Sequence, residues 1–333
     1  MALRQRDPIG MALTRKPSLK QLFESRTPDS ILVIRTDRVG DLILSTPFLR
    51  SLREQFPSAH ITAWVAPYCE QVLIATGLVD SIVTSLPSGH FDLAVSLAPR
   101  SESLKNTFAS AATLRVGYIY TDRPMVRLLA RRCLTHCELI KVSVPDHLEH
   151  EVEHLDRLAR FMGLPPSTQR PLELGLRFKT KDWSVLHLGD RWFTNGWSVD
   201  DVIRLCYGME AFGRLVVTAG PREAELVARG GFAEFDLRTG LRFAEWCQLI
   251  GESKLLVSPD TGAVHVAAAL ETPVVVAYEA ESYQHCSVQW RPWKVPHRAL
   301  VKGAPDSTVT EILSAAREIL DAKKRSREAP RQG

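Results

Sequence analysis

Leu255-Leu-Val-Ser-Pro-Asp260-Thr-Gly262-Ala-Val-His265-Val-Ala-Ala-Ala-Leu270 is the stretch that decides the fold of this chain. It has the pattern of a buried strand, a polar turn with a glycine and an alanine-rich helix. A second stretch, Ile31-Leu-Val-Ile-Arg-Thr-Asp-Arg-Val-Gly40-Asp41 followed by Thr46-Pro47, has the same order of apolar strand, polar turn and helix. Ligands of open α/β sheets bind at the carboxyl ends of strands, where both turns lie. The two stretches therefore predict the two halves of one ligand site.

Strands and helices alternate on both sides of a proline-rich linker at Leu164–Thr168. Two such arrays predict an α/β protein with two doubly wound, Rossmann-like domains that face each other across a cleft. We predict a flexible or loosely helical N-terminal extension at 1–29, one domain at 30–166, a second at 167–322 and a basic tail at 323–333. The predicted strands are Ile31–Ile34, His60–Val65, Ser81–Thr84, Leu93–Leu97, Val185–Leu188, Leu215–Thr218, Leu255–Val257 and Val274–Ala277, and the predicted helices begin at Thr46 or cover Cys69–Thr76, Pro145–Gly163, Asp200–Phe212, Arg222–Arg229, Phe243–Ile250, Thr261–Leu270 and Val309–Ala322.

The composition excludes several classes of function. A net charge of +4 over 333 residues is too small to indicate a nucleic-acid partner. We expect neither a signal peptide nor a membrane span, and six scattered cysteines indicate reduced thiols and a cytoplasmic location. No Gly-x-Gly-x-x-Gly supports a dinucleotide cofactor and no Asp-x-Asp supports a metal-chelating transferase, so we expect no cofactor and no metal. Basic residues gather at both ends, where they are either solvated tails or attract an anionic membrane surface or acceptor.

The first turn offers a candidate general base. Gly40 is expected to let the backbone turn sharply, so that Asp41 projects into the cleft. A partly desolvated carboxylate there suits proton removal from an acceptor hydroxyl. Alternatively, Asp41 caps the helix or pairs with Arg35 or Arg38, and Asp37 competes for the role of base.

The second turn has the pattern of an anion site. Asp260 is positioned to cap the following helix, and the amides of Thr261, Gly262 and Ala263 are free to meet a negative group. Gly262 also has no side chain to block a diphosphate. His265 lies one turn further, where it either donates to a phosphate or sugar hydroxyl or simply packs in the helix.

Other segments provide further candidates. The loop His187–Trp192 follows a strand, faces the predicted ligand and contains Arg191. Glu223 follows Gly220-Pro221 at the end of another strand. It either accepts hydrogen bonds from a ribose diol or is an acid in a first helical turn, where the helix dipole favours it. His147, His150 and His154, with Glu151 between them, have helical spacing that allows a metal site, although a solvated helix face is the simpler interpretation.

These motifs together resemble glycosyltransferase family 9, the ADP-heptose:lipopolysaccharide heptosyltransferases. The specific parts are Arg35–Asp41 with Thr46-Pro47, and Ser258–Leu270. Weaker similarities lie at Arg115–Tyr118, Glu151–Gly163, Trp197 and Gly220–Glu223. The resemblance, from residue 31 to about 320, implies a two-domain GT-B fold, an acceptor-side N-terminal domain, a nucleotide-sugar-binding C-terminal domain, metal independence and inversion at the anomeric carbon.

The resemblance also implies roles for individual residues. Asp41 falls on the base, with Arg35, Asp37, Arg38 and Gly40 in the acceptor-side loop. Donor contacts fall on Asp260, Thr261, Gly262, His265 and Glu223.

The chain departs from the family pattern at two positions. The family usually has a lysine two residues before the tryptophan that matches Trp197, and here that residue is Asn195. Loss of one cation beside the leaving diphosphate could cost about 2–4 kcal/mol of transition-state stabilisation, and Arg191 in the same loop is the candidate substitute. A glycine is usual near residue 279, and here it is Glu279.

We therefore predict an inverting glycosyltransferase that moves a heptose or related sugar from ADP-heptose or a similar nucleotide-sugar donor to a lipopolysaccharide core or similar glycan acceptor, at the cytoplasmic face of the inner membrane. One alternative is a non-catalytic nucleotide-sugar-binding or scaffold protein, favoured by Asn195 and Glu279. Another is a transferase with a different donor or a protein acceptor.

Overall fold

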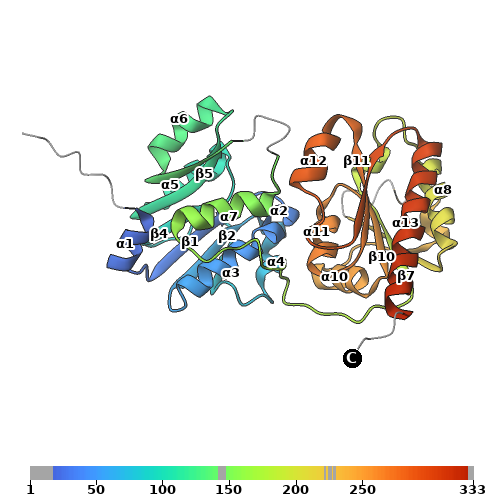
Figure 1. Cartoon of the computed structure of the whole chain (residues 1–333), viewed down its shortest axis with the longest axis horizontal. Coiled ribbons are helices and arrows are strands. Elements are labelled where there is room, and N and C mark those ends of the chain that lie inside the picture. The colour runs from blue at the N-terminus through green and yellow to red at the C-terminus, as the bar shows by residue number, and fades with distance from the viewer. Residues whose placement is uncertain (1–17, 142–147, 221–222, 224–226, 228–229, 329–333) are drawn as a thin grey trace, which may run out of the picture.

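The structure, a computed structural model, describes residues 18–141, 148–220, 223, 227 and 230–328. They form two lobes that lie side by side, each a parallel sheet with helices on both faces (Figure 1). None of the helices in these residues is long and apolar enough to cross a membrane.

The N-terminal lobe is built on a six-stranded sheet in the order β3-β2-β1-β4-β5-β6, with every neighbouring pair parallel. Its strands are β1 (Ser30–Arg35), β2 (His60–Val65), β3 (Ser81–Val83), β4 (Leu93–Ser96), β5 (Leu114–Tyr120) and β6 (His136–Ile140). Its helices are α1 (Leu19–Ser25), α2 (Val39–Leu44), α3 (Thr46–Gln55), α4 (Glu70–Leu73), α5 (Ser101–Ala109), α6 (Pro124–Cys133) and α7 (Glu151–Met162).

The C-terminal lobe repeats this topology, with the strand order β12-β11-β10-β7-β8-β9 and again only parallel neighbours. Its strands are β7 (Trp183–Leu188), β8 (Arg214–Ala219), β9 (Asp236–Arg238), β10 (Leu255–Pro259), β11 (Val274–Glu279) and β12 (His297–Lys302). Its helices are α8 (Val199–Glu210), α10 (Phe243–Glu252), α11 (Gly262–Ala269), α12 (Tyr283–Gln289) and α13 (Pro305–Glu328). In both sheets the order of the strands reverses beside the first strand, which is the point where doubly wound folds bind ligands.

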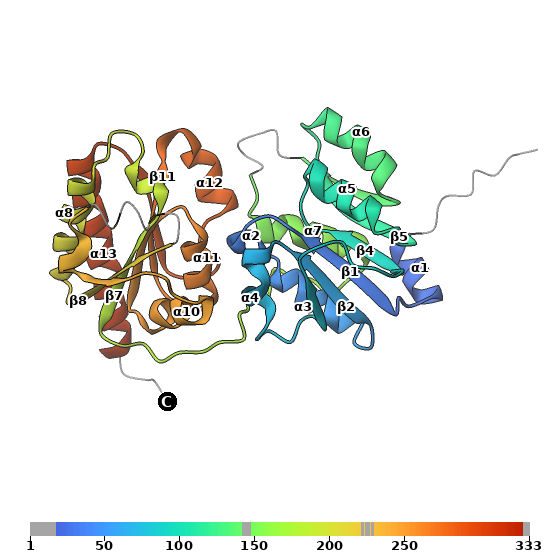
Figure 2. The ribbon, with the colours of Figure 1, turned by 180° about the vertical axis from the view of Figure 1, so that it is seen from behind.

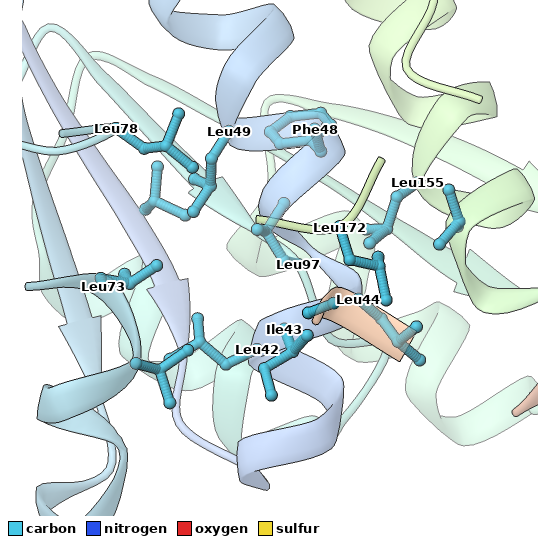
Figure 3. Packing of buried hydrophobic residues seen from close by; sticks show 14 of the residues in the cluster. Leu42, Ile43, Leu44, Phe48, Leu49, Leu73, Leu78, Leu97, Leu155 and Leu172 are labelled. Carbon is cyan, nitrogen blue, oxygen red and sulfur yellow. The ribbon is translucent and has the colours of Figure 1, made fainter. Parts of the chain in front are cut away.

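The core of the N-terminal lobe explains why its first helices form. Leu42, Leu44, Phe48 and Leu49 are buried on α2 and α3 and pack in one cluster with Leu155 of α7 (Figure 3). On α3 the buried residues Phe48, Leu49 and Leu52 follow the helical period, so this helix packs one apolar stripe into the core. Burial of each such side chain stabilises the fold by about 1.5–3 kcal/mol.

Helix α3 begins at Thr46, as predicted, although Thr46 does not cap it. Ser45 is the N-cap, because α2 ends there, and Thr46 and Pro47 are already inside the helix. The Thr46 hydroxyl instead donates to the carbonyl of Ile43 at 2.7 Å. Further upstream, α1 lies within the predicted N-terminal extension, and its Phe23 ring packs on Phe56 with centroids 5.1 Å apart.

A linker of residues 163–182 joins the lobes and runs along their lower edge in both views (Figures 1 and 2). It is fixed to the N-terminal lobe by the ion pairs Arg170–Glu54 and Arg50–Glu173. The predicted helix Pro145–Gly163 is shorter than expected, since its described part begins at Glu151, with His150 as N-cap. Most of the predicted helix Arg222–Arg229 lies outside the described residues.

Candidate active site

The two sequence stretches meet where α2 of the N-terminal lobe contacts α11 of the C-terminal lobe. A Cβ atom at Gly40 would lie 2.3 Å from Cδ2 of His265, and one at Gly262 would lie 3.7 Å from Cβ of Val39. The prediction that Gly40 serves a sharp turn is wrong: Gly40 lies in the first turn of α2 and is not among the residues with positive φ. Its small size is needed because the other lobe approaches so closely.

Arg35 organises the N-terminal half of the site. Its guanidinium is 2% exposed and contacts three carboxylates: Asp37 at 2.9 Å, Asp41 at 3.1 Å and Glu151 at 3.2 Å. Arg35 also donates to the carbonyl of Leu97. One buried cation therefore fixes three carboxylates, and the predicted alternative that Asp41 pairs with Arg35 describes a contact that is present.

Glu151 is the most enclosed of the three carboxylates, with a side chain 3% exposed. It accepts hydrogen bonds from the Tyr118 hydroxyl at 2.8 Å, the Tyr120 hydroxyl at 3.3 Å and Gln289 Nε2 at 3.0 Å. Burial raises the pKa of Glu151, but the hydrogen bond to His154 and the Arg35 charge outweigh it and lower this pKa to about 2. Glu151 is thus ionised at neutral pH and holds Arg35 in place.

Asp37 and Asp41 have different surroundings, although both contact Arg35. Asp37 is the more buried, and burial raises its pKa more than the Arg35 charge lowers it. Asp41 is 13% exposed and accepts a hydrogen bond from Trp290 Nε1 of the C-terminal lobe at 3.3 Å. Asp41 is therefore the carboxylate that faces the junction of the lobes. Arg38 is the exposed N-cap of α2.

The C-terminal half of the site is the start of α11. Thr261 is the N-cap, so the prediction that Asp260 caps this helix is wrong. Asp260 instead forms an ion pair with Arg191, which places a guanidinium next to the helix N-terminus. Helix geometry leaves the amides of Gly262 and Ala263 without intrahelical partners, and the dipole favours an anion there. Backbone amides and one arginine thus lie together in the arrangement that the sequence predicts for an anion site.

His265 lies at the contact between the two halves. It is 5% exposed, and burial lowers its pKa, so the imidazole is neutral at pH 7. Its Nδ1 atom is buried without a hydrogen-bond partner among the described residues. Such a buried nitrogen is costly unless a ligand or water satisfies it.

The two residues that depart from the family pattern contact each other. Asn195 Nδ2 donates to Glu279 Oε2 at 2.5 Å, and the Thr194 hydroxyl donates to Glu279 Oε1 at 2.7 Å. Lys302 of β12, whose side chain is fully buried, pairs with Glu279 at 2.7 Å. Asn195 has φ +53°, in the left-handed region that asparagine tolerates. Glu279 is thus neutralised inside the protein, and Asn195 is held by it.

Two further predictions concern the remaining candidates. Glu223 is buried and its amide donates to the carbonyl of Gly220 at 3.2 Å. The interpretation of His150, Glu151 and His154 as a solvated face is wrong, since all three are buried; His147 lies outside the described residues. Within the described chain no group of three or more histidine, cysteine or acidic residues could hold a metal ion.

Sequence reasoning missed four residues that complete the site. Glu151, Gln289, Trp290 and Lys302 lie far from the two motifs in sequence and reach them only in the fold. Glu151 had a signal, because an acid four residues before the apolar run Leu155, Leu158, Ala159 begins a helix whose inner face is buried. The short helix α12 ends at Gln289 and is followed by Trp290, and neither residue had such a signal.

The fold and the site together define a class of protein. Two Rossmann-like lobes with a carboxylate on one side of their junction and an anion site on the other are the architecture of GT-B glycosyltransferases. Solved structures share this fold: Escherichia coli heptosyltransferase WaaC with ADP has a TM-score of 0.68 at 16% identity, over 87% of this chain and 99% of that chain. Escherichia coli ADP-heptose lps heptosyltransferase II has a TM-score of 0.65 at 18% identity, over 89% and 99%.

Comparisons of the sequence with a family model and with known proteins agree with this class. Residues 204–313 match the family model described as glycosyltransferase family 9 (heptosyltransferase). Lipopolysaccharide heptosyltransferase 3 of Escherichia coli (strain K12) is 24% identical over 302 residues, which cover 76% of this chain and 82% of that protein. The comparisons thus support a heptosyltransferase-like glycosyltransferase, and the resemblance to glycosyltransferase family 9 indicated by the motifs is confirmed.

Proposed function

We propose that this enzyme transfers a heptose, or a related sugar, from an ADP-sugar to a lipopolysaccharide core or similar glycan, with inversion and without a metal ion. The observation that carries this proposal is the contact between α2 and α11, which brings the Asp41 carboxylate and the anion site before α11 to one junction. Solved structures of similar fold support the choice of donor, since they hold Escherichia coli heptosyltransferase WaaC with ADP and with ADP-2-deoxy-2-fluoro heptose.

In this reaction Asp41 accepts the proton of an acceptor hydroxyl. The hydroxyl oxygen forms a bond to the anomeric carbon, on the face opposite to the nucleotide, and the bond from that carbon to the diphosphate oxygen breaks. ADP leaves with the electron pair. The amides of Gly262 and Ala263, with Arg191, stabilise the charge that develops on the diphosphate.

Two donor contacts belong to the same proposal. Neutral His265, whose Nδ1 has no partner among the described residues, supplies a hydrogen bond to a phosphate or sugar hydroxyl. Glu223 and Asp260 complete the donor side: Glu223 accepts from the ribose, and Asp260 orients Arg191. Thr261 contributes its amide.

We further propose that the charge on the diphosphate is balanced by these groups alone. Activity should then persist in a strong chelator such as EDTA, because the amides and Arg191 need no divalent ion. Complete loss of sugar transfer in EDTA, restored by Mg²⁺ or Mn²⁺, would contradict metal independence.

A second candidate is a nucleotide-sugar-binding protein without turnover. The contact between Asn195 and Glu279 favours it, because a neutral amide paired with a carboxylate stands where the family usually has a lysine, and neither group can stabilise a negative leaving group. Incubation with a panel of nucleotide-sugars, with and without lipopolysaccharide core, separates the two. Acceptor-dependent release of ADP supports the transferase, whereas calorimetric binding of ADP-heptose without any release supports the binding protein.

A further inference from the structure

Helix α6 has an unusual composition for the surface of this protein. With its N-cap, the segment Arg123–Cys133 contains four arginines and no acidic residue. Proline at the first helical position starts the helix, as is common. The segment is also the outermost element at one corner of the N-terminal lobe (Figure 1).

The two faces of α6 differ sharply. The inner face carries Val126, Leu129, Ala130 and Cys133, at the spacing i, i+3, i+4 and i+7, and packs against α5 and β5. The outer face carries Met125, which is 76% exposed, and Leu128, which is 62% exposed. Arg131 and Arg132 follow Leu128 by three and four residues and so neighbour it on the helix surface, and exposed Arg127 flanks this outer face. Two apolar side chains thus stand in solvent among three guanidinium groups.

The three outer arginines have no counter-ion among the residues that the structure describes. Arg127, Arg131 and Arg132 form no ion pair with any residue that the structure describes, whereas Arg157 of α7 pairs with Glu149 and Arg170 pairs with Glu54. Their charges therefore remain available for an external anion. An arginine-rich helix with exposed apolar residues and no acid is typical of helices that lie in a membrane interface.

The position of α6 relates this face to the active site. The helix follows the carboxyl end of β5, at the same edge of the sheet as Asp41. Its N-cap Arg123 lies over the Tyr120 ring at 5.1 Å, and Tyr120 donates to Glu151. The outer face of α6 therefore starts beside the network that holds Arg35.

We propose that the outer face of α6 docks on an anionic lipid bilayer, with Met125 and Leu128 inserted at the acyl boundary and Arg127, Arg131 and Arg132 at the lipid phosphates. Charge complementarity selects the partner, since three exposed arginines with no ion pair to any described residue favour an anionic surface. The exposed leucine and methionine among them favour one with an apolar interior. Docking in this way would place the acceptor side of the enzyme at the membrane surface.

Vesicle sedimentation of the full chain tests this. Vesicles of equal parts phosphatidylglycerol and phosphatidylcholine should bind the protein, and vesicles of phosphatidylcholine alone should not. The variant Arg127→Gln/Arg131→Gln/Arg132→Gln should lower the partition coefficient by about 100-fold, and Met125→Ser/Leu128→Ser by about tenfold. Thermal unfolding of each variant checks that the fold is retained.

Matched controls remove the same groups elsewhere. Arg298→Gln/Arg317→Gln/Lys324→Gln removes three positive charges from the C-terminal lobe, and Ile74→Ser/Tyr207→Ser removes two exposed apolar side chains, 61% and 52% exposed. Both should bind vesicles as the unmodified protein does. A third control, Arg4→Gln/Arg6→Gln/Arg15→Gln, removes charge from the N-terminal extension.

Three results would overturn the proposal: no binding of the unmodified protein to anionic vesicles, unchanged binding of both α6 variants, or equal loss with the C-terminal-lobe control. Release by the N-terminal control with retention of the α6 variants would assign the contact to the extension instead. The assay contains neither donor nor acceptor. Its failure therefore leaves the proposed sugar transfer intact, and loss of transfer activity leaves the lipid contact intact.

Discussion

The two halves of the candidate active site lie on sheets of the same topology, but one consists of side chains and the other mainly of backbone amides. The N-terminal half consists of buried side chains, in which Arg35 forms ion pairs with Asp37, Asp41 and Glu151. In the C-terminal half, the start of α11 presents backbone amides, and the nearby side chains are already paired as Arg191 with Asp260 and Lys302 with Glu279. The first half carries an excess of negative charge, whereas the second is balanced before any ligand binds.

This difference indicates how each half tolerates change. A buried side-chain network loses much when one member is removed, because the partners stay buried and unpaired. An anion site made of amides keeps most of its function when a neighbouring side chain is replaced, since the backbone donors remain. Substitutions in the N-terminal half should therefore have the larger effects.

The largest effect is expected for Asp41→Asn. Loss of the general base should lower turnover by roughly 10²–10⁴, with donor affinity nearly unchanged because Asp41 belongs to the other half. Trp290 and Arg35 still contact the substituted side chain, so the fold should be retained. Acceptor-dependent release of ADP measures the turnover, and calorimetric titration of ADP measures the affinity of the donor side. Normal turnover would mean that Asp41 is only an ion-pair partner of Arg35.

The next largest effect concerns Glu151 and pH. Its pKa falls from 4.5 to about 2 in the folded protein, so ionised Glu151 stabilises the fold above pH 4.5, and this stabilisation is lost as the pH falls toward 2. A shift of this size is worth on the order of 3 kcal/mol. Glu151→Gln should therefore lower the free energy of unfolding at pH 7, and its difference from the unmodified protein should shrink between about pH 5 and pH 2.

Denaturant unfolding across that pH range measures the difference. Glu54→Gln is the matched control, because it breaks the ion pair with Arg170 at the surface, where such pairs contribute about 0–1 kcal/mol. If Glu151→Gln behaves like this control at every pH, the network around Arg35 is not the tightly coupled half of the site.

In the C-terminal half the largest effect is expected for Arg191→Ala. Arg191 lies beside the anion site through its pair with Asp260, and its removal should weaken ADP binding by roughly 1–3 kcal/mol. Calorimetric titration of ADP decides. Arg204→Ala, which removes an ion-paired arginine from α8, is the control and should leave the affinity unchanged. Unchanged affinity in Arg191→Ala would mean that the arginine serves Asp260 alone.

The two motifs could be predicted as partners because their strands are apolar runs and their turns lie at carboxyl ends of parallel strands. The need for a small residue at position 40 could not be predicted. Gly40 is required because His265 of the other lobe packs against it, and no local sequence pattern indicates that contact. The same holds for Trp290, which meets Asp41 only once the lobes are in place.

The segment between β4 and α7 was missed for a different reason. Helix α6 has the apolar spacing of Val126, Leu129, Ala130 and Cys133 and a proline at its first position, so its signal was present in the sequence. The exposed apolar residues Met125 and Leu128 obscured the helical period of this segment, because they remove the usual contrast between a polar outer face and an apolar inner face.

The smallest effect is expected where the two departures from the family pattern meet. Asn195→Lys would restore a cation near the diphosphate, but its ammonium should pair with Glu279, which already binds Asn195. The positive φ of residue 195 also costs a lysine about 1 kcal/mol. We therefore expect Asn195→Lys alone to tighten ADP binding by less than about 1 kcal/mol, well short of a full charge-assisted hydrogen bond.

A double-mutant cycle tests whether Glu279 is the cause. Glu279→Gln keeps a hydrogen-bonding side chain beside Thr194 and removes the charge, so Asn195→Lys should tighten ADP binding more in that background than in the unmodified protein. Equal gains in both backgrounds would show that Glu279 does not hold the introduced ammonium. No gain in either would mean that this loop does not face the diphosphate, which would favour the binding protein over the transferase. A larger gain in the double variant would mean that Glu279 offsets the charge of the introduced lysine, and that the amides of α11 bind the anion without a cation at residue 195.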